Sequence, residues 1–304
     1  MPNNIYVFED KFRSYQKLIN DSLAGIFMGE DSSCDITMEA ALYSLMAGGK
    51  RIRPVMMFAV TDMLSGSLED VLPFACAVEM IHTYSLIHDD LPCMDNDDTR
   101  RGIPTCHIKY SEPIALLAGD ALLNRAYEIM LSACINGDSR KIKAAAFTAD
   151  MAGVRGMIGG QTIDILSGGK KIPEELLKSL HQKKTGCLLA VPVIVPVYLF
   201  RQTEAEPILE NTLTEYARHI GLSFQIKDDL LDATSTKEVL GKSTGKDAAE
   251  SKSTFVTLFG LRKAQILLHK EMERAHESLV LLNKRGYDTR FLEDLSAYLL
   301  VREN

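Results

Sequence analysis

The chain has 304 residues, of which 46% are hydrophobic and 25% are charged. This balance is typical of a compact globular protein and excludes a disordered or fibrous chain. The 34 basic residues against 41 acidic ones give a net charge of -7. Such a charge argues against nucleic acid as the main partner, because phosphate backbones bind to basic faces.

The six cysteines form no CxxC pair and no tight Cys/His spacing, so neither a zinc site nor a disulfide framework is expected. Reduced thiols favour a cytoplasmic protein. The N-terminal segment lacks the basic start and apolar stretch of a signal peptide. The longest apolar run, Cys187–Phe200, has 14 residues, which is too short to span a bilayer, and no membrane partner is expected.

Helical periodicity runs through most of the chain. Long segments rich in Ala, Leu, Met, Glu and Lys predict helices over residues 38–46, 55–64, 71–87, 113–131 and 255–282. The stretch LLAVPVIVPVYLF (188–200) is predicted to be a kinked core helix. No period-2 strand, repeat or linker divides the sequence, so we expect one all-α domain over residues 1–304.

A basic segment lies between the first two predicted helices. Gly48-Gly49-Lys50-Arg51-Ile52-Arg53-Pro54 places three cations beside two glycines, which allow the backbone to approach an anion closely. Pro54 is suited to the first turn of the next helix. The segment therefore predicts a phosphate-binding site, although a run of charges is more often a solvated surface.

The first acidic cluster is SLIHDDLPCMDNDDTRRG, with Asp89, Asp90 and Asp95. On an unbroken helix Asp89 and Asp95 would point about 240° apart and could not share a metal ion. Pro92 disfavours helical geometry at the preceding residue, so the helix should end there and the loop should bring Asp95 round to Asp89. The alternative is a solvated acidic loop.

The second acidic cluster is FQIKDDLLD, with Asp228, Asp229 and Asp232. Asp228 and Asp232 lie about 40° apart on one helix face and one turn apart along the axis. Two carboxylates at this spacing repel each other unless a cation lies between them, and their oxygens suit Mg²⁺ that holds substrate phosphates. Acidic and basic clusters that alternate along a helical chain therefore indicate metal-bridged diphosphate binding.

These residues resemble the trans-isoprenyl diphosphate synthases, and most closely the bacterial farnesyl diphosphate synthases. The motifs follow in family order, namely GGKRIRP, EMIHTYSLIHDDLPCMDNDDTRRGIPT, LAGDALL, GGQTIDI, HQKKTG, FQIKDDLLD and GKSTGKD. The resemblance implies the isoprenoid synthase fold, a helical bundle around a deep central cavity, in a homodimer. It also implies three Mg²⁺ ions per active site, which Mn²⁺ could replace.

The resemblance also assigns roles to single residues. It implies that Mg²⁺ binds to Asp89, Asp90, Asp95 and Asp228, with support from Asp229 and Asp232. It places around the allylic diphosphate Arg100, Lys184, Thr185, Gln225, Lys242 and Lys252. It places around isopentenyl diphosphate Lys50, Arg53, His82 and Arg101. Without the resemblance, His82 would be read as a buried core histidine.

The activity implied is a head-to-tail condensation of isopentenyl diphosphate with dimethylallyl or geranyl diphosphate. Ionisation of the allylic C–O bond gives a carbocation, which the double bond of isopentenyl diphosphate attacks before a proton is lost. In this family, bulky residues before the first aspartate motif limit product length. Here those positions are Tyr84 and Ser85, and the aromatic ring favours a C15 product, farnesyl diphosphate.

Three alternatives are weighed against this reading. A geranylgeranyl or longer-chain synthase would share every motif, because Tyr84 could simply pack in the helix core. A non-catalytic partner subunit usually loses its aspartates, and none is lost here. A terpene cyclase also ionises allylic diphosphates, but it has no need of the cations that bind isopentenyl diphosphate.

Overall fold

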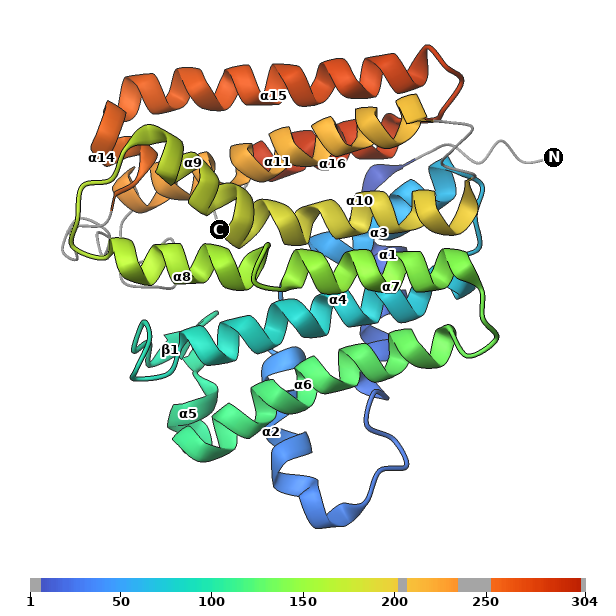
Figure 1. Cartoon of the computed structure of the whole chain (residues 1–304), viewed down its shortest axis with the longest axis vertical. Helices are drawn as coiled ribbons and strands as arrows, with labels where there is room; N and C mark the ends of the chain where they lie inside the picture. The colour runs from blue at the N-terminus through green and yellow to red at the C-terminus, as the bar shows by residue number, and fades with distance from the viewer. Residues whose placement is uncertain (1–6, 202–206, 235–252, 302–304) are drawn as a thin grey trace.

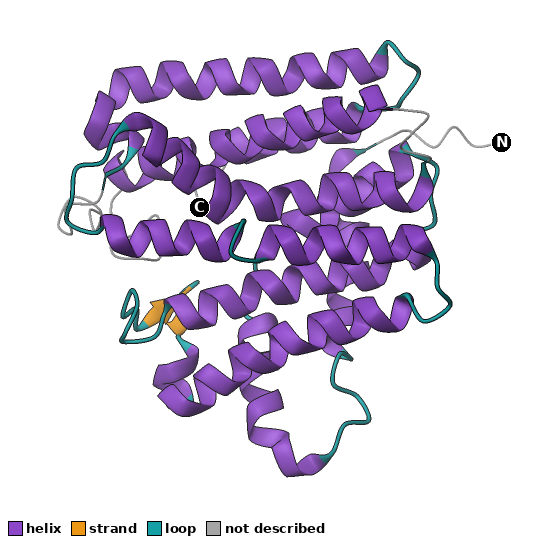
Figure 2. Cartoon of the chain, viewed as in Figure 1, coloured by secondary structure: helices purple, strands orange, loops and turns teal. Residues whose placement is uncertain are grey.

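The computed structural model describes residues 7–201, 207–234 and 253–301, and nearly all of its regular structure is helical (Figures 1 and 2). The all-α prediction is confirmed. The longer helices are α1 (Phe8–Ala24), α2 (Asp35–Leu45), α3 (Ile52–Met63), α4 (Leu68–Asp89), α6 (Glu112–Ala133), α7 (Ser139–Ala152), α8 (Met157–Ser167), α9 (Glu174–His181), α10 (Cys187–Phe200), α11 (Pro207–Thr234), α15 (Leu261–Asn283) and α16 (Arg290–Val301). The shorter ones are α5 (Cys106–Lys109) and α14 (Phe255–Phe259).

The one sheet among these residues is a hairpin of two short strands, β1 (Thr99–Arg100) and β2 (Ile103–Pro104). The strands pair antiparallel, with Arg100 opposite Ile103. The periodicity of the sequence did not predict this hairpin, because two residues are too few to show a period of 2. Its position directly after the first aspartate motif places Arg100 and Arg101 beside that motif.

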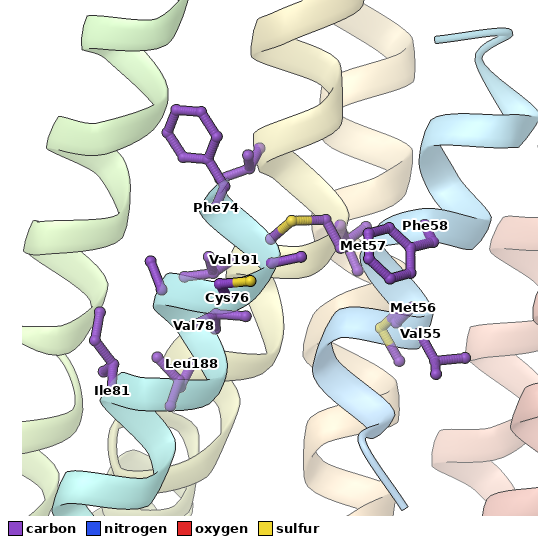
Figure 3. Close-up of a cluster of buried hydrophobic side chains, with 14 of the residues drawn as sticks. Val55, Met56, Met57, Phe58, Phe74, Cys76, Val78, Ile81, Leu188 and Val191 are labelled. Carbon is purple, nitrogen blue, oxygen red and sulfur yellow. The ribbon is translucent and has the colours of Figure 1, made fainter. Parts of the chain in front are cut away.

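The long helices are stacked roughly parallel to one another, and α10 is packed against α3, α4, α7 and α11 (Figure 1). Figure 3 shows side chains of α3, α4 and α10 meeting in the core, among them Met57, Phe74 and Val191. All three of these side chains are fully buried. A helix that is apolar on every side, as α10 is, has to be covered on every side.

Helix α10 is continuous through Pro192 and Pro196, which confirms the helix predicted for this stretch. With α9 and the π-helical segment η2 (Gln182–Gly186), it forms one helical run, Glu174–Phe200, of 27 residues. This run is long and apolar enough to cross a membrane, so the length argument made from 14 residues was wrong. However, 67% of its apolar window is buried inside the protein, as in a core helix.

Two further details differ from the predicted helices. The helix expected over 255–282 is divided into α14 and α15 at Gly260, whose φ of 77° is rare for residues with a side chain. The helix predicted over 71–87 begins earlier, at Leu68, so Pro73 lies inside α4. Pro54, by contrast, lies in the first turn of α3 as predicted.

A buried ion pair joins the basic segment to α4. Arg51 Nη1 donates to Glu79 Oε1 at 2.9 Å, and the side chains are only 2% and 3% exposed. Arg51 also donates to the Leu45 carbonyl and the Asn20 side chain. It has a φ of 53° at the N-cap of α3. Of the three cations in this segment, Arg51 is therefore the one that anchors the chain.

Removal of one partner of this pair is expected to be costly. Glu79→Ala should lower the free energy of unfolding by about 3 to 5 kcal/mol, because it leaves the Arg51 charge buried without its partner. The matched control is Lys17→Ala, which breaks the exposed Lys17–Asp21 pair and should cost less than about 1 kcal/mol. Urea unfolding measures both variants, and equal losses would contradict the importance of burial.

Candidate active site

The first aspartate motif turns back on itself where α4 ends. Helix α4 stops at Asp89, and the Asp95 amide donates to the Asp89 carbonyl at 2.8 Å. The Asp97 amide donates to the Asp90 carbonyl at 3.2 Å in the same turn. The prediction from Pro92 is confirmed, because the loop brings Asp95 round to the end of the helix that carries Asp89.

The charges around Asp89 favour a bound cation. The pKa of Asp89 is raised to about 6, mainly by burial; the charges of Lys184 and Arg100 oppose this rise, whereas those of Asp95 and Asp90 add to it. The ionised carboxylate is therefore poorly stabilised by the protein alone. A divalent cation would relieve this repulsion, so the donor groups at this turn fit the predicted Mg²⁺.

Asp90 has a different partner from Asp89. Its buried carboxylate, 3% exposed, accepts from Arg100 Nε at 2.8 Å and from Arg100 Nη2 at 2.6 Å. This two-pronged contact fixes the β1–β2 hairpin against the end of α4. Asp90 positions Arg100 in this structure, and its role as a metal ligand stays a prediction.

The second aspartate motif lies near the C-terminal end of α11, with Asp228 and Asp232 half-buried and Asp229 only 4% exposed. Asp229 Oδ1 accepts from Gln225 Nε2 at 3.0 Å, and Asp229 Oδ2 accepts from the Phe255 amide at 2.8 Å. Asp228 raises the pKa of Arg53, so these two side chains are close enough to interact. Asp229 is therefore a support of the site rather than an open ligand.

Lys184 and Thr185 lie in η2, where the helix makes a π-type turn. Lys184 Nζ is 2.5 Å from Asp164 Oδ2 of α8, and Thr185 Oγ1 donates to Gln225 Oε1 at 3.2 Å. A side chain at Gly160 of α8 would come within 2.2 Å of the Lys184 backbone nitrogen. Close packing of α8 on η2 thus requires glycine, and single π turns of this kind are common at functional sites.

Three of the residues predicted for isopentenyl diphosphate, Arg53, His82 and Arg101, are close enough to interact. Burial lowers the pKa of His82 well below its usual value, and Arg53 and Arg101 lower it further. Burial also lowers the pKa of Arg53 to about 10. His82 is therefore an uncharged ring among guanidinium groups, a cluster that suits a polyanion.

The two glycines before this cluster make the approach of Arg101 possible. Gly48 has a φ of 88° and Gly49 a φ of 110°, and Arg101 Nη1 donates to the Gly48 carbonyl. A side chain at Gly49 would meet the Arg101 guanidinium at 2.8 Å. The Nζ of the neighbouring Lys50 lies over the Tyr298 ring, 5.6 Å from its centre.

The two residues predicted to control product length lie one turn before Asp89. Tyr84 is 6% exposed, and its ring meets the His88 ring edge-on, with ring centres 5.6 Å apart. Ser85 is half-buried and donates through Oγ to the His82 carbonyl at 2.9 Å. Tyr84 is therefore a buried ring, and its control of product length stays a prediction.

Some predicted residues are not brought together by the described chain. Lys242 and Lys252 lie outside the described residues. Within residues 7–201, 207–234 and 253–301, no three His, Cys, Asp or Glu side chains are grouped closely enough to hold a metal ion alone. A cation at the aspartates needs further ligands, which water and phosphate oxygens supply in Mg²⁺ sites.

Sequence reasoning missed three residues of this site, Asp164, Gly160 and Phe255. The GGQTIDI motif contains the first two, and its lone acid on a helix near the lysines was the available signal for Asp164. Phe255 gave no signal, because it contributes to the site through its backbone amide.

Comparison with known proteins shows to which family this chain belongs. The model of the polyprenyl synthetase family matches residues 35–282. This chain belongs to the polyprenyl synthetase family. It is a prenyltransferase that elongates prenyl diphosphate chains.

Individual relatives agree with this membership. The chain is 37% identical to farnesyl diphosphate synthase of Haemophilus influenzae, over 98% of this chain and 99% of the relative. It is 41% identical to the chloroplastic geranylgeranyl pyrophosphate synthase 7 of Arabidopsis thaliana, over 88% of this chain and 76% of the relative. A geranyltransferase structure from Helicobacter pylori, complexed with magnesium and isoprenyl diphosphate, is 30% identical with a TM-score of 0.84 and covers 97% of both chains.

Proposed function

We propose that this prenyltransferase makes farnesyl diphosphate, the C15 product, from isopentenyl diphosphate and dimethylallyl or geranyl diphosphate. The observation that carries this choice is Tyr84, a buried aromatic ring one turn before Asp89, held edge-on against His88. We propose that this ring takes up the space that a longer product would need. The similarity to the farnesyl diphosphate synthase of Haemophilus influenzae supports the same choice.

A C20 product, geranylgeranyl diphosphate, is the second candidate. The specific observation in its favour is the 41% identity to the Arabidopsis thaliana enzyme, which exceeds the 37% identity to the Haemophilus influenzae enzyme. A non-catalytic partner subunit is less well supported, because the chain retains both aspartate motifs.

Mg²⁺ is the proposed cofactor, held by Asp89, Asp95 and Asp228 together with substrate phosphates. Asp90 and Asp232 are proposed as further ligands, and Asp229 as the support that keeps α11 in place. Three ions per site, and replacement by Mn²⁺, remain part of this proposal. When bound, the ions would supply positive charge that stabilises the departing diphosphate.

The side chains of this protein would assist the reaction in two ways. Lys184 and Arg100 would bind the allylic diphosphate and stabilise the negative charge that grows on it as its C–O bond breaks. Thr185 and Gln225 would present their oxygens to the positive charge that develops on the allylic carbon. Lys242 and Lys252, which lie outside the described residues, are proposed to bind the same diphosphate.

A second set of residues would hold the attacking substrate. Arg53, His82 and Arg101, with Lys50, would bind isopentenyl diphosphate so that its double bond faces the allylic carbon. A buried site excludes water, which would otherwise quench a carbocation. The proton lost in the last step is proposed to leave on the released diphosphate.

The state of the protein in the cell belongs to the same proposal. We infer a cytoplasmic homodimer built from one polyprenyl synthetase domain, with neither nucleic acid nor membrane as a partner. Six free cysteines support a reducing compartment. Exposed apolar side chains on α6, namely Leu116, Leu117 and Leu131, support a covered face in a dimer.

One assay tests the proposed function. Purified protein is incubated with isopentenyl diphosphate, Mg²⁺ and each of three primers, dimethylallyl, geranyl and farnesyl diphosphate, and the products are identified by chromatography. The expected result is C15 product from the first two primers and little elongation of the third. Efficient elongation of farnesyl diphosphate to C20 would overturn the C15 assignment in favour of the second candidate.

Proton competition at Asp89 gives a pH-dependent prediction. Because burial raises the pKa of the metal-free Asp89 carboxyl to about 6, protonation below this pH should compete with Mg²⁺. The fraction of ionised Asp89 falls about tenfold from pH 7 to pH 5, and Mg²⁺ affinity should fall by about the same factor. Calorimetric titration of Mg²⁺ at both pH values measures this change. Asp89→Asn should bind Mg²⁺ weakly with a smaller pH dependence, and a wild-type affinity independent of pH would contradict the assignment.

A further inference from the structure

His181 is a buried histidine with an unusual environment. It is the last residue of α9, directly before η2, and it is 7% exposed. Among the described residues, neither of its ring nitrogens has a hydrogen-bond partner. Buried polar atoms without partners are costly, so the ring is kept in this position at a cost in stability.

The ring lines a polar cavity of about 150 Å³, which is also lined by the Lys184–Asp164 ion pair. Other residues that line the cavity are Gln225, Asp229, Ser253 and Thr254. A polar cavity of this size can hold several water molecules. The cavity thus connects His181 with both of the elements that carry the proposed diphosphate-binding groups.

A chain of contacts links the His181 ring to Thr185 through Phe255, Asp229 and Gln225. The His181 ring stacks on the Phe255 ring, with centres 5.4 Å apart and planes 26° apart. The Phe255 amide donates to Asp229, which accepts from Gln225, which in turn accepts from Thr185. Thr185 follows His181 by four residues along η2. These contacts therefore connect η2, α11 and the start of α14.

The charge state of the ring suits this place. Burial lowers the pKa of His181 to about 4, and nearby Lys184 lowers it while Asp164 raises it. At neutral pH the ring is uncharged, so it does not compete with Lys184 for the Asp164 carboxylate. The uncharged His181 ring can therefore pack between η2 and Phe255 without adding charge beside a bound diphosphate.

We propose that His181 and Phe255 are positioning residues for the prenyl transfer reaction, which hold Lys184 and Thr185 of η2 at a fixed position relative to Gln225 and Asp229 of α11. The inference rests on the proposed role of these four residues at the allylic diphosphate. Groups on two elements act together on one ligand only if their relative position is fixed, and an error of 1 Å can cost about 100-fold in rate. The stacked pair lies outside the binding groups and supplies this constraint.

The test compares variants of each ring with matched controls. His181→Gln and Phe255→Leu remove the stack, His181→Phe keeps an aromatic ring against Phe255, and His269→Gln and His276→Gln are controls. Both control histidines are exposed on α15, away from the stacked pair. Steady-state kinetics yield kcat and separate KM values for geranyl diphosphate and isopentenyl diphosphate, and thermal unfolding reports stability.

We expect His181→Gln and Phe255→Leu to lower kcat/KM for geranyl diphosphate by about 10-fold to 100-fold, while KM for isopentenyl diphosphate changes less than about twofold. His181→Phe should recover most of the loss, and the controls should resemble the wild type. Variants that only melt at lower temperature, or that lose affinity for both substrates equally, would overturn the positioning role. A wild-type enzyme that makes C20 product would contradict the proposed product and leave this comparison intact.

Discussion

Asp89→Ala is expected to lower kcat/KM at least about 1000-fold, which corresponds to about 4 kcal/mol of transition-state stabilisation. The reason is the position of Asp89 at the end of α4, where the turn at Pro92 brings Asp95 beside it. The pair is proposed to hold the Mg²⁺ that stabilises the departing diphosphate. Steady-state assays at saturating Mg²⁺ measure the effect.

The stability of a second variant, Asp89→Asn, gives an independent check on Asp89. The raised pKa of Asp89, about 6 against an ordinary 3.8, means that its charge destabilises the metal-free fold by about 3 kcal/mol at neutral pH. Asp89→Asn removes the charge and keeps the shape, so without Mg²⁺ it should unfold at a higher temperature than the wild type. Loss of activity together with gain of stability is the pattern of a functional carboxylate held under strain.

Asp98→Ala is the matched control for this prediction. Asp98 lies in the same acidic loop, and its side chain is exposed. Its removal should change kcat/KM less than about threefold, because a solvated surface charge contributes little. Equal losses in Asp89→Ala and Asp98→Ala would show that the loop acts through its total charge rather than through one placed carboxylate.

Local sequence rules were enough to predict the shape of both aspartate motifs. Pro92 alone indicated that α4 ends and that the loop turns back, and the spacing of Asp228 and Asp232 indicated one face of a continuous helix. In both cases the determining residues lie within a few positions of the feature. Such rules follow from backbone geometry, so they hold whatever the rest of the chain does.

The supporting contacts could not be predicted in the same way. Asp229 is bound by the amide of Phe255, 26 residues later, and Lys184 by Asp164, 20 residues earlier. Periodicity cannot show which of several nearby cations is buried, so Arg51 was not distinguished from its neighbours as the anchor. The contacts of Asp229 and Lys184 depend on tertiary packing of α8, α11 and α14 around η2.

The proposed limit on product length also depends on tertiary packing. Tyr84 contacts His88, and His88 Nε2 lies 3.0 Å from the Leu116 carbonyl of α6. A side chain at Gly119 of α6 would come within 2.1 Å of the His88 ring, so glycine is required for this approach. The Tyr84 ring is thus supported from α6 and has little freedom to move aside for a longer chain.

Tyr84→Ala is therefore expected to change the main product from C15 to C20 and longer chains. The substitution removes a buried ring supported by His88, so the space it occupied becomes available to the growing prenyl chain. The same loss of packing should lower the free energy of unfolding by about 3 to 5 kcal/mol, so folding is checked by circular dichroism at the assay temperature. Chromatography of the products formed from geranyl diphosphate measures the change in length.

Tyr84→Phe is the matched control, because it keeps the ring and removes only the hydroxyl. Burial raises the pKa of Tyr84 to about 12, so the hydroxyl is not ionised and its loss should leave a C15 product. A C20 product from Tyr84→Phe would assign the effect to the hydroxyl rather than to the volume of the ring. Folded, active Tyr84→Ala that still makes only C15 would place the limit on product length elsewhere in the core, because the space left by the ring would then be closed to the product.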